Sequence, residues 1–226
     1  MAGVSDFRFV QYLALKTDSA WRRLPEEERR RGRAELTQEL ESGDGIKSYA
    51  YSTLGLKTGA DLFLWRMSDG PDRLQESLGR LLLTGLGKYL QVTHSLIGLI
   101  RPSTYVRRQD SQEQAIFEQE RQRYLIVYPF SKTTEWYLMS KDARQGMMNE
   151  HMRIGHEFPK VRQLLVYSTG LDDQEFIVSY ETEDLDAFQQ LVIALRDTEA
   201  RRFTLRDTPI FTCVYRSVPE TLALLG

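Results

Sequence analysis

The chain carries two copies of one sequence pattern, and this duplication limits the possible folds more than any other feature. Residues 9–21 are echoed by residues 125–136, with Lys132 lying 116 residues after Lys16. The segment around Ser52 recurs at the same offset. This spacing is much longer than the roughly 20–50 residues of a solenoid repeat. It indicates two copies of a domain-sized unit, so the positions at which the copies differ point to function.

Size and composition predict a globular protein of two units. Of its 226 residues, 41% are hydrophobic and 27% are charged, which is typical of a soluble domain. The net charge of −2 gives no reason to expect nucleic acid or an anionic membrane as partner. No apolar run approaches the roughly 20 residues of a membrane helix, and no signal peptide is visible. A single cysteine, Cys213, lies in an apolar run and is expected to be buried. We therefore expect a cytoplasmic protein.

Each copy reads as strand, helix, strand, strand, helix and final strand. Strands are expected at residues 7–15, 46–53, 60–67, 95–100, 124–130, 161–168, 175–181 and 209–215. Helices are expected at about residues 25–41, 71–89, 140–158 and 184–201. This order is typical of a ferredoxin-like α+β unit, an antiparallel sheet covered by helices on one face. Closing one such sheet against the other predicts a dimeric α+β barrel.

This pattern divides the chain into an N-terminal unit, residues 1–106, a charged linker, residues 107–123, and a C-terminal unit, residues 124–226. Trp21 and Trp136 recur in both copies, so they are expected in the cores.

The helix after the first strand differs most between the copies. In the first copy it is highly charged, whereas residues 141–156 hold two of the three histidines and three of the six methionines. One face of this second helix combines apolar and small side chains with one imidazole: Met147, Met148, His151, Ile154 and Gly155. His151 therefore lies on the apolar face, and the small Gly155 leaves space one turn later. We expect the first copy to be structural and the second to carry the site.

His151 can be a core histidine or a ligand. One histidine cannot build a zinc site, which needs three or four protein ligands. Asp172 and Asp173 read better as a turn than as a hard-metal site, because the other oxygen ligands are missing. The sequence has no glycine-rich phosphate loop, no Cys-x-x-Cys and no Gly-x-Ser-x-Gly. A single axial imidazole on an apolar helix face suits haem.

The second half resembles the chlorite dismutase family. The matching motifs are Tyr128-Pro-Phe-Ser-Lys132-Thr, Trp136-Tyr, Glu150-His151-x₃-Gly155, Ser168-Thr-Gly-Leu-Asp-Asp and Glu175-Phe176. That family includes haem-dependent chlorite dismutases and the coproheme decarboxylases of haem biosynthesis. The resemblance implies paired ferredoxin-like units, haem b or iron coproporphyrin (coproheme) in the C-terminal unit, and a homopentamer.

The resemblance also implies roles for residues on the proximal side of the porphyrin. His151 matches the ligand of the haem iron, with His156 as the competing candidate. Glu199 matches the glutamate that bonds to the other ring nitrogen of that ligand and so sets its tautomer. The alternative for Glu199 is an ordinary surface residue at a helix end.

The distal position separates the two activities of the family. Gln163, five residues before Ser168, matches a position at which chlorite-degrading members have arginine. A neutral glutamine cannot hold an anionic substrate, and one bacterial group of coproheme decarboxylases has glutamine there. Arg162 is adjacent, but neighbouring residues of a strand face opposite sides, so it could replace Gln163 only after a register slip.

Tyr128 matches the tyrosine whose radical attacks a propionate in coproheme decarboxylases, although chlorite-degrading relatives keep it too. Lys132 matches a lysine that contacts propionate, and Arg196 is a second candidate for that role. Because Lys16 occupies the equivalent place in the first copy, Lys132 can instead be structural. Arg196 can instead be an ordinary arginine on the surface of a helix.

The leading prediction is a coproheme decarboxylase that uses hydrogen peroxide and a porphyrin substrate to form haem b. One alternative is chlorite dismutation to chloride and dioxygen. Another is a family member of unknown role that binds haem weakly or not at all. The segment between His151 and Gln163, one residue shorter than in the family, keeps this alternative open.

Overall fold

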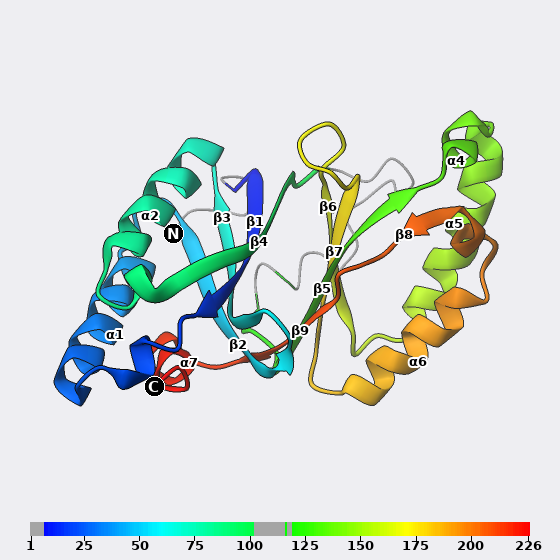
Figure 1. Ribbon diagram of the computed structural model, residues 1–226. Coiled ribbons are helices and arrows are strands. Elements are labelled where there is room, and N and C mark those ends of the chain that lie inside the picture. The colour runs from blue at the N-terminus through cyan, green and yellow to red at the C-terminus, as the bar shows by residue number, and fades with distance from the viewer. Residues whose placement is uncertain (1–6, 102–115, 117–118) are drawn as a thin grey trace. The chain divides into compact units, whose positions relative to one another are not determined.

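The computed structural model describes residues 7–101, 116 and 119–226 (Figure 1). The chain divides into two compact units, Met1–Ile100 with Thr212–Gly226 and Arg101–Phe211. Residues 212–226, which the repeat assigns to the second copy, thus belong to the first unit. Most of the expected linker 107–123 lies outside the described residues. Among the helices of the described part, none combines the length and the apolar character that a membrane crossing requires.

The first unit is built on an antiparallel sheet in the order β4–β1–β3–β2, with β9 beside β2. Its strands are β1 (Phe9–Thr17), β2 (Lys47–Lys57), β3 (Ala60–Ser68), β4 (Leu90–Leu99) and β9 (Phe211–Tyr215). Its helices are η2 (Trp21–Arg23), α1 (Glu26–Glu41), α2 (Pro71–Leu83), η3 (Gly87–Tyr89) and α7 (Val218–Ala223). Helices α1 and α2 cover one face of the sheet (Figure 1).

The core of the first unit is fully buried between its sheet and its helices. Strand alternation turns Leu13 and Leu15 of β1 and Leu62 and Leu64 of β3 toward the helices. All four side chains are fully buried there. Trp21 joins the same cluster and is 1% exposed, which confirms its expected place in the core.

The second unit repeats the design with the strand order β6–β7–β5–β8, again antiparallel. Its strands are β5 (Tyr124–Lys132), β6 (Arg162–Tyr167), β7 (Phe176–Thr182) and β8 (Thr204–Arg206). Its helices are α4 (Thr134–Leu138), α5 (Lys141–His156), α6 (Leu185–Arg196) and η4 (Glu199–Phe203). Trp136 of α4 is 3% exposed, as expected for a core residue.

Capping side chains explain where the two long helices of the second unit begin. Ser140 accepts a hydrogen bond from the backbone of Ala143 at the start of α5. Asp184 does the same for Asp186 and Ala187 at the start of α6. The expected helix over residues 184–201 is wrong in its last turns, because α6 ends at Arg196 and the tighter η4 follows. The expected α+β class, with antiparallel sheets covered by helices, is confirmed.

Candidate functional site

The pairing of the strands in the second sheet shows which residues lie on the same face. Tyr180 of β7 lies directly between Ile126 of β5 and Gln163 of β6, and Tyr128 pairs with Val178. These residues share the side that packs against α6, which we call the helix-facing side. The sequence left open whether Gln163 or Arg162 takes this side.

Arg162 lies on the other side of the same sheet. It pairs with Glu181 in the register, and its guanidinium donates a hydrogen bond to the carbonyl oxygen of Glu120 at 2.9 Å. The side-chain amide of Gln163, in contrast, forms no hydrogen bond with another described residue. Of these two neighbouring residues of β6, it is therefore the neutral amide and not the cation that lies on the helix-facing side.

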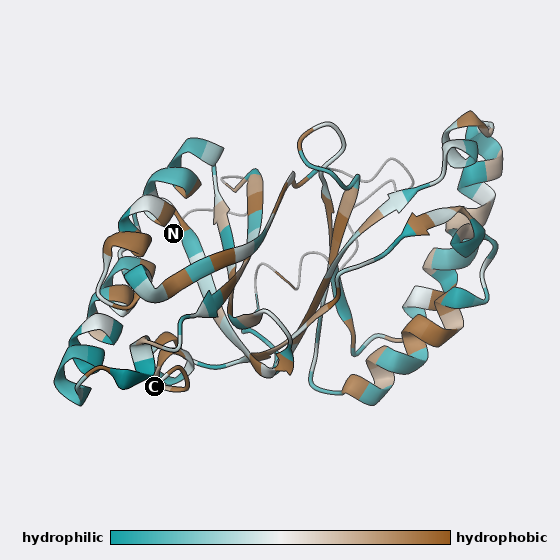
Figure 2. Cartoon of the chain, in the orientation of Figure 1, coloured by the Kyte–Doolittle hydropathy of each residue, from teal (hydrophilic) through white to brown (hydrophobic). Residues whose placement is uncertain are grey.

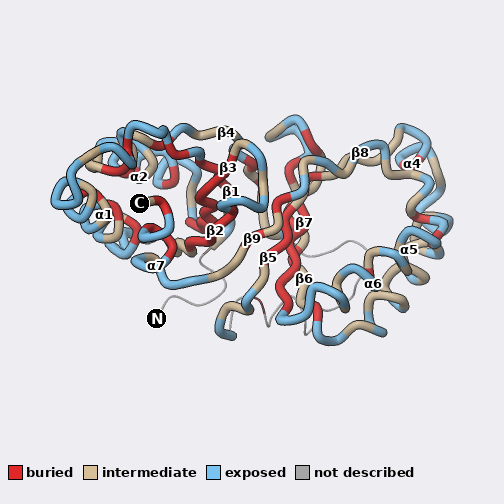
Figure 3. Tube along the Cα trace, turned by 60° about the horizontal axis from the view of Figure 1, so that its bottom comes forward, coloured by how far each residue is buried: buried red, intermediate tan, exposed pale blue. Residues whose placement is uncertain are grey.

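The helix-facing side is less tightly covered in the second unit than in the first. Its residues Gln163, Leu165, Tyr167 and Phe176 are half-buried, as is Tyr128. The corresponding leucines of the first unit are fully buried. No residue of α5 is buried, and Figure 3 shows this helix in the colours of intermediate and exposed residues. The second unit thus leaves apolar and aromatic surface between its sheet and its helices.

His151 lies on a partly covered face of α5. Met147, Met148, Ile154 and Gly155 are half-buried like His151 itself. A methyl group added at Gly155 would meet no atom within 4 Å, so the space expected beside this glycine is present. Figure 2 shows that α5 mixes hydrophilic and hydrophobic residues along its length.

The imidazole of His151 is held in its neutral form. Burial and, secondarily, the positive charge of Lys132 lower the pKa of His151 to about 4, and Glu150 acts weakly in the opposite direction. The ring forms no hydrogen bond with another described residue. A neutral imidazole is the form that binds a metal ion. The competing candidate, His156, is exposed at the end of α5.

The ammonium group of Lys132 uses some, but not all, of its hydrogen-bond donors within the protein. Its ammonium donates to the carbonyl oxygen of Ala200 at 3.2 Å and to Thr204 Oγ1 at 3.4 Å, and it lies 4.5 Å from the ring centroid of Trp136. Burial, followed by the charge of Arg201, lowers the pKa of Lys132 to about 8, against an opposing effect of Glu175. Since an ammonium has three donors, one remains for a ligand.

The two lysines of the repeat have different surroundings. Lys16 forms an ion pair with the buried Asp61 at 2.8 Å, on the side of the first sheet turned away from its helices. Lys132 reaches η4 and α4 on the helix-facing side of the second sheet. The structural role of Lys16 therefore does not transfer to Lys132.

Two arginines gather on one carboxylate near Tyr128. Asp207 accepts hydrogen bonds from Arg201 at 2.9 Å and from Arg196 at 3.5 Å. The charges of all three residues act on Tyr128. Arg201 was not predicted from the sequence, since its place in Arg196-Asp-Thr-Glu-Ala-Arg201 carries no signal that separates it from a surface arginine. The charge of Arg201 also acts on Lys132, while Arg196 shares Asp207 with Arg201.

Tyr128 is paired with a second phenol, Tyr180. Their ring centroids lie 6.0 Å apart at an interplanar angle of 30°. Burial raises the pKa of Tyr128, and its interaction with Tyr180 partly offsets this rise. Burial also raises the pKa of Tyr180 well above its usual value. The sequence motifs did not single out Tyr180.

Glu199 does not reach His151 through its side chain in the described contacts. Its side chain is 62% exposed, and its carboxylate forms an ion pair with Arg202 at 3.2 Å. Its backbone N–H instead donates to the carboxylate of Glu150 at 3.1 Å. Glu150 thereby ties α5 to η4, and its negative charge is the one that acts on His151.

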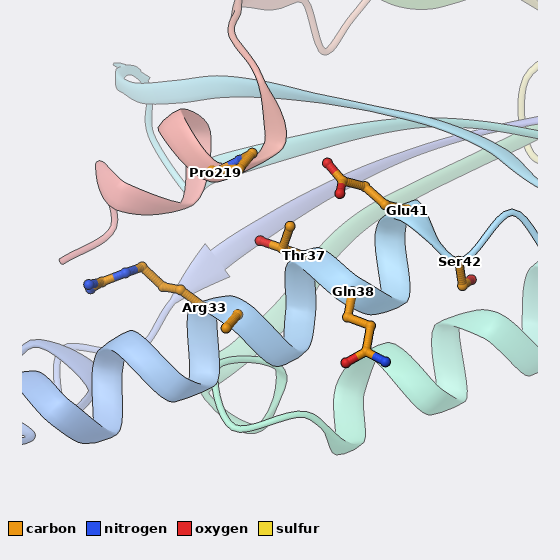
Figure 4. Close-up of a pocket in the computed structure, with 7 residues that line it drawn as sticks. Arg33, Thr37, Gln38, Glu41, Ser42 and Pro219 are labelled. Carbon is orange, nitrogen blue, oxygen red and sulfur yellow. The ribbon is translucent and has the colours of Figure 1, made fainter.

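A shallow pocket lies in the first unit, whereas the residues described above belong to the second. Arg33, Thr37, Gln38, Glu41, Ser42 and Pro219 line it (Figure 4). Its one cation, Arg33, already donates to Glu26 at 2.7 Å and to the carbonyl oxygen of Gly226 at 2.6 Å. Nothing in this set suggests catalysis.

The residues gathered in the second unit fit an iron porphyrin. A haem group needs a neutral nitrogen ligand and apolar walls, and its carboxylates need cations. His151 could supply the ligand, the half-buried helix-facing side could supply the walls, and Lys132, Arg196 and Arg201 could supply the cations. The fit rests on this donor set and on the incomplete cover of the helix-facing side.

Known sequences and a family model match most of this chain. Residues 27–216 match the family model described as chlorite dismutase. A coproheme decarboxylase of Mycolicibacterium smegmatis is 30% identical over 191 residues, which cover 84% of this chain and 81% of that protein. A chlorite dismutase of Ideonella dechloratans is 29% identical over 164 residues, covering 70% of this chain and 58% of that protein.

Solved structures share the fold along nearly the whole chain. A mutant chlorite dismutase from Candidatus Nitrospira defluvii superposes with a TM-score of 0.88 at 29% identity, covering 96% of this chain and 95% of that one. A chlorite dismutase from the same organism in complex with imidazole gives 0.87 at 28% identity, with coverages of 96% and 94%.

Proposed function

The chain belongs to the chlorite dismutase family of haem-dependent enzymes, and from this premise we propose that it is a coproheme decarboxylase. The substrate is iron coproporphyrin, the oxidant is hydrogen peroxide, and the product is haem b. The observation that carries the choice is the neutral Gln163 on the helix-facing side, with Arg162 turned to the other side. The relative from Mycolicibacterium smegmatis, named coproheme decarboxylase, supports the same choice.

The stoichiometry of the proposed reaction is simple. Each propionate that becomes a vinyl group loses carbon dioxide, one proton and two electrons. Those two electrons, with two protons, reduce one hydrogen peroxide to two water molecules. The bound iron porphyrin supplies the peroxide-dependent oxidising power when it is present.

His151 is the proposed iron ligand, because its imidazole is neutral and lies on the apolar face of α5. Tyr128 is the proposed redox-active residue. Its phenol would give up one electron and one proton, and would regain both by removing a hydrogen atom from the propionate carbon next to the ring. The substrate would then lose its second electron to the oxidant, and cleavage of the bond to the carboxylate would release carbon dioxide and leave the vinyl group. Burial raises the pKa of Tyr128, so the phenol retains its proton until it is oxidised.

Lys132, Arg196 and Arg201 are the proposed contacts for the substrate carboxylates. Arg201 and Arg196 share Asp207, which holds their guanidinium groups in place. Charge-assisted hydrogen bonds from such cations are about twice as strong as neutral ones. They would hold a propionate close to Tyr128.

The proposal is tested by adding coproheme to the purified protein and recording its absorption spectrum. Titration with peroxide follows, and mass spectrometry identifies the porphyrin. We expect a histidine-ligated spectrum and conversion of two propionates to vinyl groups. Absence of binding at micromolar concentrations would overturn the assignment. Dioxygen release on addition of chlorite, without decarboxylation, would replace it by chlorite dismutation.

The role of Lys132 predicts a pH dependence. Its pKa of about 8 means that the free protein loses this positive charge as the pH rises through about 8. A bound carboxylate favours the charged form, so the midpoint in the complex lies higher. We expect the affinity for coproheme to fall by about 10-fold between pH 7 and pH 9, since one charge-assisted contact is worth about 1.5–3 kcal/mol. The measurement is a spectroscopic binding titration at each pH.

Two variants serve as controls for this dependence. Lys132→Arg keeps its charge throughout this range and should bind without the decline. Lys132→Met should bind weakly at pH 7 and change little with pH. A decline in Lys132→Met equal to that of the unmodified protein would assign the titration to another group.

A further inference from the structure

Arg144 of α5 has no counter-ion among the residues that the structure describes. Every other arginine in the described α-helices forms an ion pair with an aspartate or a glutamate. Arg153 on the same helix, for example, pairs with Glu157 at 2.9 Å. The Nε atom of Arg144 is shielded from solvent and has no hydrogen-bond partner within the described part of the chain. Because a shielded polar group without a partner is unfavourable, this arginine calls for an explanation.

The local energetics of the helix do not explain an arginine at this position. Arg144 lies one turn after Ser140, the residue that caps the N-terminus of α5. The helix dipole disfavours a cation near that end. The residues one turn before and after Arg144 could pair with it along the helix, but none of them is acidic: Ser140, Lys141, Met147 and Met148.

Arg144 lies on the same face of α5 as the proposed iron ligand. It is half-buried, like Met147, Met148 and His151. Seven residues make nearly two turns, so Arg144 and His151 project in nearly the same direction, about 10 Å apart along the helix axis. This separation is comparable to that between the iron at the centre of a porphyrin and the carboxylates at its rim. A porphyrin bound to His151 can therefore bring a carboxylate to the Arg144 guanidinium.

We propose that Arg144 binds a propionate of the porphyrin substrate, an inference that rests on the proposed function and adds a residue to its binding site. The cations already assigned come from other elements. Lys132 is held at η4, and Arg196 and Arg201 are held at Asp207. Coproheme carries propionates on several sides of its ring, so cations from separate elements suit it. A guanidinium also offers parallel N–H donors that match the two oxygens of a carboxylate.

The inference is tested with metal-free coproporphyrin, whose fluorescence reports binding without iron, peroxide or turnover. Arg144→Gln keeps a long polar side chain and removes the charge. We expect its dissociation constant for coproporphyrin to rise by about 10- to 100-fold, the value of one charge-assisted hydrogen bond. The tetramethyl ester of coproporphyrin has the same ring but no carboxylate, so it should bind Arg144→Gln and the unmodified protein equally well.

Arg153→Gln is the matched control. It removes an arginine from the same helix, but from an exposed position at which Glu157 is the partner. We expect it to bind coproporphyrin like the unmodified protein. Equal affinities of Arg144→Gln and Arg153→Gln for coproporphyrin overturn the proposal. An equal loss of affinity for coproporphyrin and for its ester in Arg144→Gln also overturns it, because such a loss does not depend on a carboxylate.

Failure of this inference and failure of the proposed function have different signatures. If coproporphyrin binding depends on Arg144 but coproheme is not decarboxylated, the proposed function fails and the carboxylate contact stands. If coproheme is decarboxylated and Arg144→Gln binds coproporphyrin as tightly as the unmodified protein, the inference alone fails.

Discussion

Replacing His151 with alanine is expected to abolish the histidine-ligated spectrum of the porphyrin complex. The imidazole is the proposed direct ligand, and its pKa of about 4 keeps it neutral at physiological pH. Loss of a residue that merely supports a ligating histidine costs about 10- to 100-fold in metal affinity, so loss of the ligand should cost more than about 100-fold. The measurement is a coproheme titration followed by absorption and magnetic circular dichroism.

His156→Ala is the matched control, since it removes an imidazole from the same helix. His156 is exposed, whereas His151 is half-buried among methionines. We expect the spectrum to be unchanged in His156→Ala. Added imidazole should partly restore the spectrum of His151→Ala, because a methyl side chain leaves room for it. The opposite pattern, with the spectrum lost only in His156→Ala, would transfer the ligand role to His156.

Replacing Tyr128 with phenylalanine is expected to abolish decarboxylation while leaving porphyrin binding intact. The change removes one hydroxyl group and keeps the ring that packs against Tyr180. A positioned group that moves a proton in the reaction contributes about 10²- to 10⁴-fold to the rate, and we expect a loss in this range. The measurement is the single-turnover yield of vinyl groups by mass spectrometry.

Tyr124→Phe is the matched control, because it removes a hydroxyl from the same side of β5 at a position four residues earlier. It should decarboxylate at the normal rate. The coproheme dissociation constant of Tyr128→Phe should match that of the unmodified protein. Full activity in Tyr128→Phe would remove this residue from the mechanism, even if His151 remains the ligand.

Much of the scaffold could be predicted because its signals are local. Strand alternation and helix periodicity depend on neighbours within a few residues. They predicted most of the strands and helices along the chain, the helix that carries His151 and the burial of Trp21 and Trp136, but not that β9 joins the sheet of the first unit. The space beside Gly155 followed in the same way from helix geometry.

The site depends on pairing between distant segments, and here the repeat was a poor guide. Lys16 and Lys132 share one offset in the sequence, yet one lies away from the helices of its unit and the other toward them. A shift of one residue between strand and turn is enough to change the face, because side chains alternate with a period of two. Sequence similarity between the copies could not reveal that shift.

The sequence by itself determined the duplication, the α+β class, the family resemblance and the candidates His151, Tyr128 and Gln163. Only the tertiary structure put Gln163 on the helix-facing side, turned the carboxylate of Glu199 toward Arg202 and brought Tyr180 and Arg201 to Tyr128. The physical reason is that these contacts join strands and helices far apart in the chain. Their geometry is decided by strand register and by the energetics of burial, which no short stretch of residues contains.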